Sequence, residues 1–279
     1  MTYMTEMDAA TGLMSRELSR DKGRELHAAY DSAQPFPHTV IDNFLPDALL
    51  DRCLAEFPGR ELNEMHFDRD QERYKAQFNP DVLTPWNRNL FYAFNSRPFI
   101  RVLENITGIK GLIPDPYFSG AGFHEISQGG HLSMHADFNH HRPLNLERRI
   151  NVLIYLNRGW KDEYGGQLEL WDNAMTKRLV SVVPEFNRCV IFNTTSNSNH
   201  GNPNPINHPN KTPRRSIALY YYTATWDGTK REHTTQFRAR AATPDKVDWQ
   251  VKIEELADDL MPPILVRNYR RVKRRLSRA

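Results

Sequence analysis

The sequence contains only two cysteines, Cys53 and Cys189, which is too few for a disulfide framework or for a metal site built from four thiolates. No stretch approaches the roughly 18 consecutive apolar residues that a membrane-spanning helix needs. Self-similarity at a period of about 20–50 residues is absent too, and so is any low-complexity tract. A small disulfide-stabilised domain, a helical membrane protein and a repeat solenoid are therefore excluded.

The 279 residues are 39% hydrophobic and 25% charged, which is typical of a globular chain and excludes a collagen-like or wholly disordered one. A chain of this length forms one large domain with appendages, or two small ones, and can bury a sizeable core. Residues 1–21 mix acidic and basic side chains without an apolar centre, so we expect no secretory signal there. The low cysteine content adds to this, and together they predict a cytoplasmic protein.

Positive charge is concentrated at the end of the sequence. Residues 264–279 hold seven Lys and Arg side chains and no acid, so the total net charge of +3 leaves −4 on residues 1–263. Such a tail predicts contact with an anionic surface or another subunit, or else a solvated, partly helical end. Nucleic acid is not the expected partner.

The first half of the sequence predicts helices that follow a short strand. Residues 1–33 are polar and predict an N-terminal arm. A strand-like segment at 38–46 precedes an amphipathic helical pattern at 48–57, and 97–108 predicts a second helix. Residues 58–95 are polar and aromatic and carry no clear pattern.

The second half of the sequence is rich in short β-type runs that are separated by Gly, Pro and Asn turns. These runs lie at 122–127, 149–157, 166–171, 180–184, 188–195 and 216–224. Many short strands with such turns favour a β-sandwich or a β-barrel. After Trp226 the sequence becomes polar and basic, with a helical pattern around 252–260.

One group of histidines and acids has the spacing of metal ligands. His135 and Asp137 lie two residues apart at the end of a predicted strand, where side chains at i and i+2 point the same way. His200 follows just beyond another predicted strand. Two histidines and one carboxylate on one face, with the remaining positions open, form the ligand set of non-haem Fe(II) oxygenases.

An arginine near this group points to an anionic ligand. Arg214 begins a predicted strand shortly after His200, and a buried guanidinium there would be costly without an anionic partner. A dicarboxylate cosubstrate could supply that partner through a bidentate pair. Because Arg214, Ser216 and Ala218 alternate onto one strand face, we expect Arg214 rather than Arg215 to point inward.

These motifs resemble a known family. His135-Ala-Asp137, His200 and Arg214-x-Ser216, in this order within the strand-rich half, are similar to the Fe(II)/2-oxoglutarate-dependent dioxygenases, and most closely to their prolyl-4-hydroxylase-like branch. NVLIYLN followed by GGQLELW resembles the third and fourth barrel strands of that branch, and VIDNFLP resembles the strand that leads into its supporting helices. The resemblance extends over residues 38–225.

The resemblance implies an α+β fold with a mainly β core. That core is a double-stranded β-helix, or jelly roll, with supporting N-terminal helices and a helical C-terminal extension. The implied cofactor is Fe(II), with 2-oxoglutarate and O2 as cosubstrates. His135, Asp137 and His200 are the implied iron ligands and catalytic residues, and Arg214, Tyr155 and Ser216 the implied cosubstrate-binding residues.

This gives a domain organisation in three parts: a polar N-terminal arm at 1–33, a dioxygenase domain at 34–226 with its jelly-roll core at about 117–224, and a C-terminal extension at 227–279 that carries the basic tail. The expected activity is hydroxylation of an unactivated C–H bond of an amino-acid or peptidyl, sugar or biosynthetic substrate, with release of succinate and CO2. Because Asp137 retains the carboxylate that halogenating relatives replace, the resemblance favours hydroxylation, desaturation or ring closure over halogenation.

Other readings of the same residues stay open at the level of sequence. A zinc hydrolase could use the same three ligands, although no HExxH helix supports it. A non-catalytic jelly-roll binding module is the third class. Among the other histidines, His131 is a rival ligand or a group that supports one, His124 faces the cavity or caps the sheet, and His140 and His141 are expected at the surface or facing the substrate.

Overall fold

A computed structural model describes residues 1–17, 19–62, 65–227, 229–230, 232–243 and 245, with only the backbone of 65–68. The helix predicted around 252–260 and the basic tail at 264–279 lie outside these residues. Within the described residues, no helix combines the length and the apolar character required to span a membrane.

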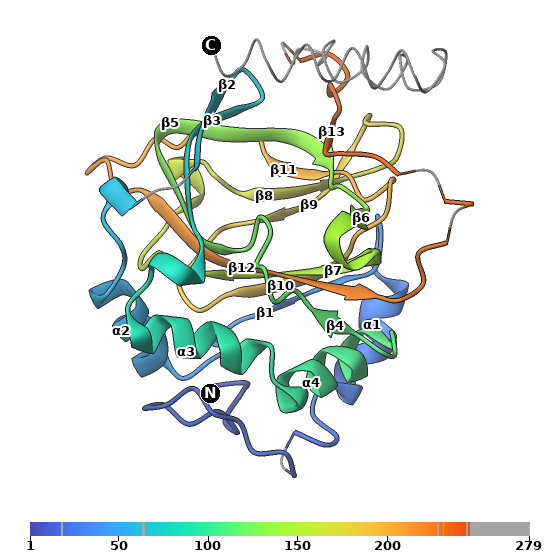
Figure 1. The fold of residues 1–279 in the computed structure, drawn as a ribbon. Helices are drawn as coiled ribbons and strands as arrows, with labels where there is room; N and C mark the ends of the chain where they lie inside the picture. Colours follow the sequence, from blue (N-terminus) through green and yellow to red (C-terminus); the bar gives the residue numbers. More distant parts are fainter. Residues whose placement is uncertain (18, 63–64, 228, 231, 244, 246–279) are drawn as a thin grey trace.

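Helices cover one side of the molecule (Figure 1). The α-helices of the described residues are α1 (His27–Ser32), α2 (Asp47–Ala55), α3 (Pro85–Phe94) and α4 (Arg97–Thr107). Short 3-10 helices occur at Arg24–Leu26, Arg60–Leu62, Pro80–Val82, Arg142–Leu144 and Asp162–Tyr164. The helices predicted at 48–57 and 97–108 match α2 and α4, and Gly108 caps the end of α4 with a left-handed φ of 74°.

The strands form one strongly curled antiparallel sheet. They are β1 (His38–Ile41), β2 (Met65–Arg69), β3 (Glu72–Phe78), β4 (Ile113–Pro114), β5 (Gly122–Ala136), β6 (His140–His141), β7 (Leu146–Tyr155), β8 (Leu168–Trp171), β9 (Arg178–Val182), β10 (Cys189–Asn193), β11 (His200–Asn202), β12 (Arg214–Thr223) and β13 (Gln236–Phe237). Their main order is β1-β10-β7-β12-β5-β11-β8-β9. All six β-type runs predicted in the second half of the sequence contain strands.

Strand β5 connects the two layers of the curled sheet. Its first part pairs with β12, from Gly122 to Ile126, whereas its last part pairs with β11 at Leu132 and His135. This arrangement makes the mainly β jelly-roll core that the resemblance implied, with the helices packed below the β1-β10-β7-β12 layer (Figure 1).

Alternation along β10 and along β7 from Ile150 to Tyr155 assigns side chains to the two sides of this layer. Ile150, Val152 and Ile154 belong to the large core that faces the helices. Tyr155, the residue after Ile154, belongs instead to the cluster with Leu168, Leu170 and Phe192 in the interior between the layers. The period-2 pattern of the sequence therefore separates a structural face from a face that lines the barrel.

Residues 58–95, which carried no clear pattern, contain the β2–β3 hairpin and α3. Strand β3 pairs with β5, but its register shifts between Arg73 and Lys75, where Tyr74 adopts a φ of 53°. The extra residue of this bulge interrupts the alternation that marks a strand in a sequence. The bulge also turns Glu72 and Lys75 toward the same interior.

Both ends of the described chain pack on the barrel domain. In the N-terminal arm, Met4 and Met7 are buried in the large core, and the Met4 N–H donates to the Phe44 carbonyl. After the expected domain end at 226, β13 pairs with β5 through Gln236 and Phe237. The sheet thus includes a strand from the segment that the sequence assigned to a C-terminal extension.

Candidate metal centre

Three side chains from two neighbouring strands form the candidate metal centre. His135 lies near the end of β5, Asp137 follows that strand directly, and His200 begins β11. His200 pairs with His135 in the antiparallel register, so both imidazoles project from the same face of the sheet. Within the described residues, this is the group of His, Cys, Asp and Glu side chains close enough to hold a metal ion.

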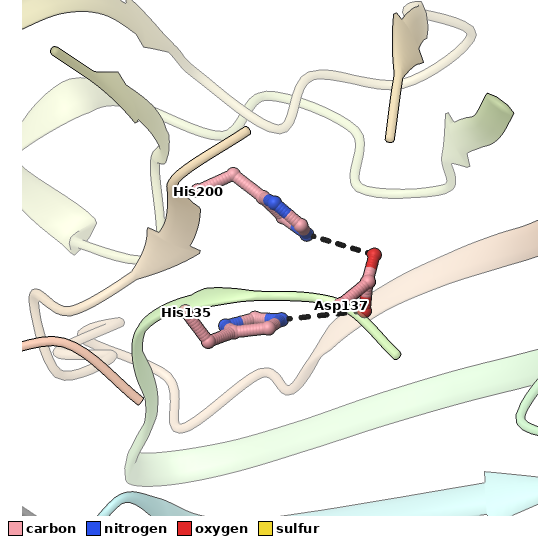
Figure 2. Close-up of side chains that lie close together, drawn as sticks. All are labelled: His135, Asp137 and His200. Carbon is pink, nitrogen blue, oxygen red and sulfur yellow. Dashed lines mark ion pairs between the residues drawn. The ribbon is translucent and has the colours of Figure 1, made fainter. Parts of the chain in front are cut away.

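The three side chains point toward one another (Figure 2). His135 Nε2 lies 3.6 Å from Asp137 Oδ1, and His200 Nε2 lies 3.3 Å from Asp137 Oδ2. One ligand atom from each residue falls within 4.8 Å of the others. Bonds of about 2.1 Å at right angles would separate neighbouring ligands by about 3 Å, so the group fits a first-row metal ion after small movements.

Backbone carbonyls orient both imidazoles for metal binding. His135 Nδ1 lies 2.9 Å from the Ser133 carbonyl, and His200 Nδ1 lies 2.9 Å from the Ser198 carbonyl. Only a protonated Nδ1 can donate to a carbonyl, which leaves the Nε2 lone pair of each ring directed toward Asp137. Burial and the neighbouring His200 lower the pKa of His135, so its ring is neutral and able to act as a ligand.

A buried arginine and an asparagine hold the Asp137 carboxylate. Arg148 Nη2 lies 3.0 Å from Asp137 Oδ2, and the Asn151 side-chain amide donates to the same oxygen at 2.7 Å. Arg148 also donates to Asn151 Oδ1. Burial alone would raise the pKa of Asp137, but Arg148 and the two imidazoles bring it well below its ordinary value. The carboxylate is therefore ionised.

The sequence did not point to Arg148 or Asn151 as parts of this site. They lie three residues apart on β7, where strict alternation would place them on opposite faces. The β7–β12 register shifts between Tyr221 and Tyr222, which leaves Arg149 without an opposite residue and returns Arg148 to the face of Asn151. No residue pattern in the sequence predicts this bulge.

The metal centre lies in a cavity of about 220 Å³ between the two layers. Among the residues that the sequence assigned to the cosubstrate, Arg214 and Ser216 line this cavity. Tyr155 is fully buried beside them, because Ser216 pairs with Tyr155 across β12 and β7. The Arg214 guanidinium lies 4.9 Å from the centre of the Tyr155 ring. The structure thus brings all six predicted residues to one interior.

Arg214 is a buried cation that forms no ion pair with a described residue. Its side chain donates from Nε to the Gly166 carbonyl at 2.8 Å. A Cβ added at Gly166 would lie only 3.0 Å from Cδ of Arg214. Burial lowers the pKa of Arg214 and raises that of Tyr155, whose hydroxyl has no hydrogen-bond partner. Arg214 thus lines the cavity, and the Tyr155 hydroxyl beside it is a buried donor without a partner.

The remaining candidates lie outside the metal group. Arg215 points away from the cavity and pairs with Glu125 at 2.9 Å. His131 Nε2 contacts the Asp70 carbonyl, and His124 lines the cavity with Nε2 on the Gly120 carbonyl. His141 is not at the surface: it is 2% exposed, and its Nε2 lies 3.3 Å from Asp115.

Comparison with known families supports the same assignment. Residues 121–222 match the family model of the 2OG-Fe(II) oxygenase superfamily, and this range contains the metal group together with Arg214, Tyr155 and Ser216. We therefore identify residues 121–222 as a 2OG-Fe(II) oxygenase domain. The protein is an Fe(II)- and 2-oxoglutarate-dependent dioxygenase, and it uses Fe(II), 2-oxoglutarate and O2.

Solved structures show the same fold at low sequence identity. A prolyl 4-hydroxylase from Phytophthora capsici is 20% identical, with a TM-score of 0.50 over 87% of this chain and 76% of that one. A prolyl hydroxylase from Trichoplax adhaerens, solved with a hypoxia inducible factor peptide, is 18% identical (TM-score 0.50; 77% and 94% covered). HygX from Streptomyces hygroscopicus, with nickel, 2-oxoglutarate and hygromycin B, is 11% identical (TM-score 0.50; 82% and 99% covered).

Proposed function

We propose that His135, Asp137 and His200 bind Fe(II) and that Arg214, with Tyr155 and Ser216, binds the distal carboxylate of 2-oxoglutarate. In this proposal the enzyme hydroxylates an unactivated C–H bond. One atom of O2 enters the substrate as hydroxyl, and the other enters the succinate that forms when 2-oxoglutarate loses CO2.

The observation that carries the proposal is the unpaired charge of Arg214. An isolated buried guanidinium is costly, and among the described residues no carboxylate offsets it. A carboxylate ligand would supply a bidentate partner and would also accept a hydrogen bond from the Tyr155 hydroxyl. A dicarboxylate with its other end at the metal group fits a cavity that contains both Arg214 and the three ligands.

The remaining residues prepare the site for this chemistry. Iron and 2-oxoglutarate, when bound, supply the oxidising equivalents for C–H cleavage. His135 and His200 offer oriented imidazole nitrogens, and Asp137 offers an ionised carboxylate whose second oxygen is held by Arg148 and Asn151. Three protein ligands on one face leave the other positions for cosubstrate and O2. Because the carboxylate is present, hydroxylation is favoured over halogenation.

The substrate reaches the metal, in this proposal, through a second cavity of about 360 Å³. Phe138 and Thr235 line both cavities, so the two adjoin next to Asp137. The Trichoplax relative was solved with a peptide and HygX with hygromycin B, and both kinds of molecule remain candidates here. We keep an amino-acid or peptidyl group, a sugar and a biosynthetic intermediate as substrate classes, and the cytoplasm as the location.

The test is an anaerobic titration of the metal-free protein with Fe(II) and then 2-oxoglutarate, followed by the visible charge-transfer band of the complex. We expect the band to require both additions. Asp137→Ala should abolish it, and Arg214→Ala should raise the 2-oxoglutarate Kd at least tenfold, since a buried charge-assisted pair is lost.

Arg215→Ala is the matched control, because the neighbouring arginine pairs with Glu125 instead of facing the cavity. It should leave the band and the Kd unchanged. A folded wild-type protein that shows no band with both additions would refute the proposed metal and cosubstrate sites. Equal effects of Arg214→Ala and Arg215→Ala would remove Arg214 from the cosubstrate site.

A further inference from the structure

Asn202 presents an unused hydrogen-bond donor to the cavity. It ends β11, lines the cavity and is 4% exposed. Its side-chain nitrogen Nδ2 is buried and has no hydrogen-bond partner. Leaving such a donor unsatisfied costs about 1–3 kcal/mol, so its retention in the interior calls for a partner that the chain itself does not provide.

The strand register places Asn202 between the metal group and Arg214. Along β5, His135 pairs with His200, Leu132 pairs with Asn202, and Ile126 pairs with Arg214 of β12. Leu132 therefore lies on β5 between the level of the metal group and the level of Arg214. A ligand that extends from the metal group to Arg214 passes the Asn202 amide.

The surroundings of Asn202 prevent its amide from finding another partner by a simple shift of the strand. A Cβ at the preceding Gly201 would stand 2.9 Å from the carbonyl oxygens of Leu132 and Ser133, so β11 runs very close to β5. The cavity wall beside Asn202 includes the apolar side chains of Leu132 and Leu168. The close packing of β11 on β5 therefore keeps Asn202 in the cavity wall.

We propose that Asn202 Nδ2 donates a hydrogen bond to a carboxylate oxygen of 2-oxoglutarate. The inference rests on the proposed function, since it needs the cosubstrate to extend between the metal group and Arg214. Asn202 then contributes to cosubstrate affinity from the β11 side of the barrel, opposite the donors of β7 and β12. It neither contacts the metal nor takes part in the chemical step.

The test uses Asn202→Leu, which removes the donor at similar size, and Asn202→Asp, which replaces it with an acceptor. Both are titrated anaerobically with 2-oxoglutarate at saturating Fe(II), with the charge-transfer band as the readout. We expect the 2-oxoglutarate Kd to rise about tenfold in Asn202→Leu, as for a lost hydrogen bond to a charged group, and further in Asn202→Asp, where two carboxylates face each other. The Fe(II) Kd of Asn202→Leu should stay within about twofold of wild type.

The exposed Asn207, in the same connection but outside the cavity, gives the control Asn207→Leu, which should match wild type in both constants. Wild-type 2-oxoglutarate affinity in both Asn202 variants would overturn the inference. An equal loss of Fe(II) affinity in Asn202→Leu would overturn it as well, since the residue would then act through the metal group. Failure of the wild-type protein to form the band refutes the proposed function instead, so the two failures are distinguishable.

Discussion

The guanidinium of Arg148 and the carboxylate of Asp137 form an ion pair of 3.0 Å in the interior, where the Arg148 side chain is only 1% exposed. The guanidinium lies over the rings of Tyr220 and Phe138, with its carbon 3.7 Å and 4.4 Å from their centres. The two aromatic rings and the Asn151 side chain hold the Arg148 guanidinium in place against the carboxylate. Arg148 therefore fixes the orientation of a proposed metal ligand.

Arg148→Gln should lower the affinity for Fe(II) about 10- to 100-fold, as is usual when a group that orients a metal ligand is lost. The reason is that Asp137 would keep only the Asn151 donor on Oδ2. Metal affinity, measured by competition with a chelator, checks this expectation. Arg215→Gln also removes a guanidinium from an ion pair, but one outside the cavity, and should bind Fe(II) like wild type. Unchanged affinity in Arg148→Gln would contradict the positioning role.

Gly166→Ala should weaken 2-oxoglutarate binding at least fivefold, because the new Cβ would crowd the Arg214 side chain at 3.0 Å. The substitution should also destabilise the fold, because Gly166 has a φ of 72° and an alanine is strained in that conformation. Gly159→Ala is the control for that strain: its φ is 63°, but nothing lies within 4 Å of its Cβ position. Both variants should lose about 1–2 kcal/mol of unfolding free energy, and only Gly166→Ala should change the Kd. The same 2-oxoglutarate Kd in Gly166→Ala and Gly159→Ala would argue against crowding of Arg214 by the new Cβ.

Glu72 predicts a pH dependence of stability. Burial alone would raise its pKa, but Lys75 at 2.8 Å and Arg69 at 3.3 Å bring it below its ordinary value of 4.5. The unfolded chain therefore binds this proton more readily, so the stabilisation is complete above pH 4.5 and is lost as the pH falls through the lower folded pKa.

Glu72→Gln should accordingly lower the unfolding free energy by about 1–3 kcal/mol at pH 7, with a difference that shrinks below the ordinary pKa. Urea unfolding at several pH values measures it. The exposed Glu163 provides the control Glu163→Gln, which should change stability little at any pH. A difference between wild type and Glu72→Gln that is constant with pH would rule out the ion pair as its source.

Within the segment after residue 226, Fe(II) binding should depend on β13 but not on the basic residues 264–279. Thr235 and Phe237 line the cavity, the Phe237 ring lies 5.6 Å from that of His135, and the Arg238 N–H donates to the Met134 carbonyl. A chain that ends after residue 231 should therefore bind Fe(II) at least tenfold more weakly than wild type. A chain that ends after residue 263 should keep its Fe(II) affinity and its 2-oxoglutarate turnover, measured as succinate release. Equal binding by the two truncated chains would contradict the role of β13.

Much of the site could be predicted because its residues carry their chemistry in short spacings. His135 and Asp137 need only an extended chain to face one ion, and the alternation of Arg214 and Ser216 needs only a strand. These features are local, so the sequence also predicted the strands and the inward direction of Arg214. The hairpin of β2 and β3 was not predicted, because the bulge at Tyr74 breaks the alternation on which strand prediction depends.

The sequence by itself determined the types of ligand, their order along the chain and the two faces of each strand. Only the tertiary structure decided which distant groups complete the centre: Arg148 against Asp137, Asn202 beside the path to Arg214, and β13 beside His135. The physical reason is that strand register and bulges set these contacts. Register is a property of paired strands, and one inserted residue changes which side chains share a face.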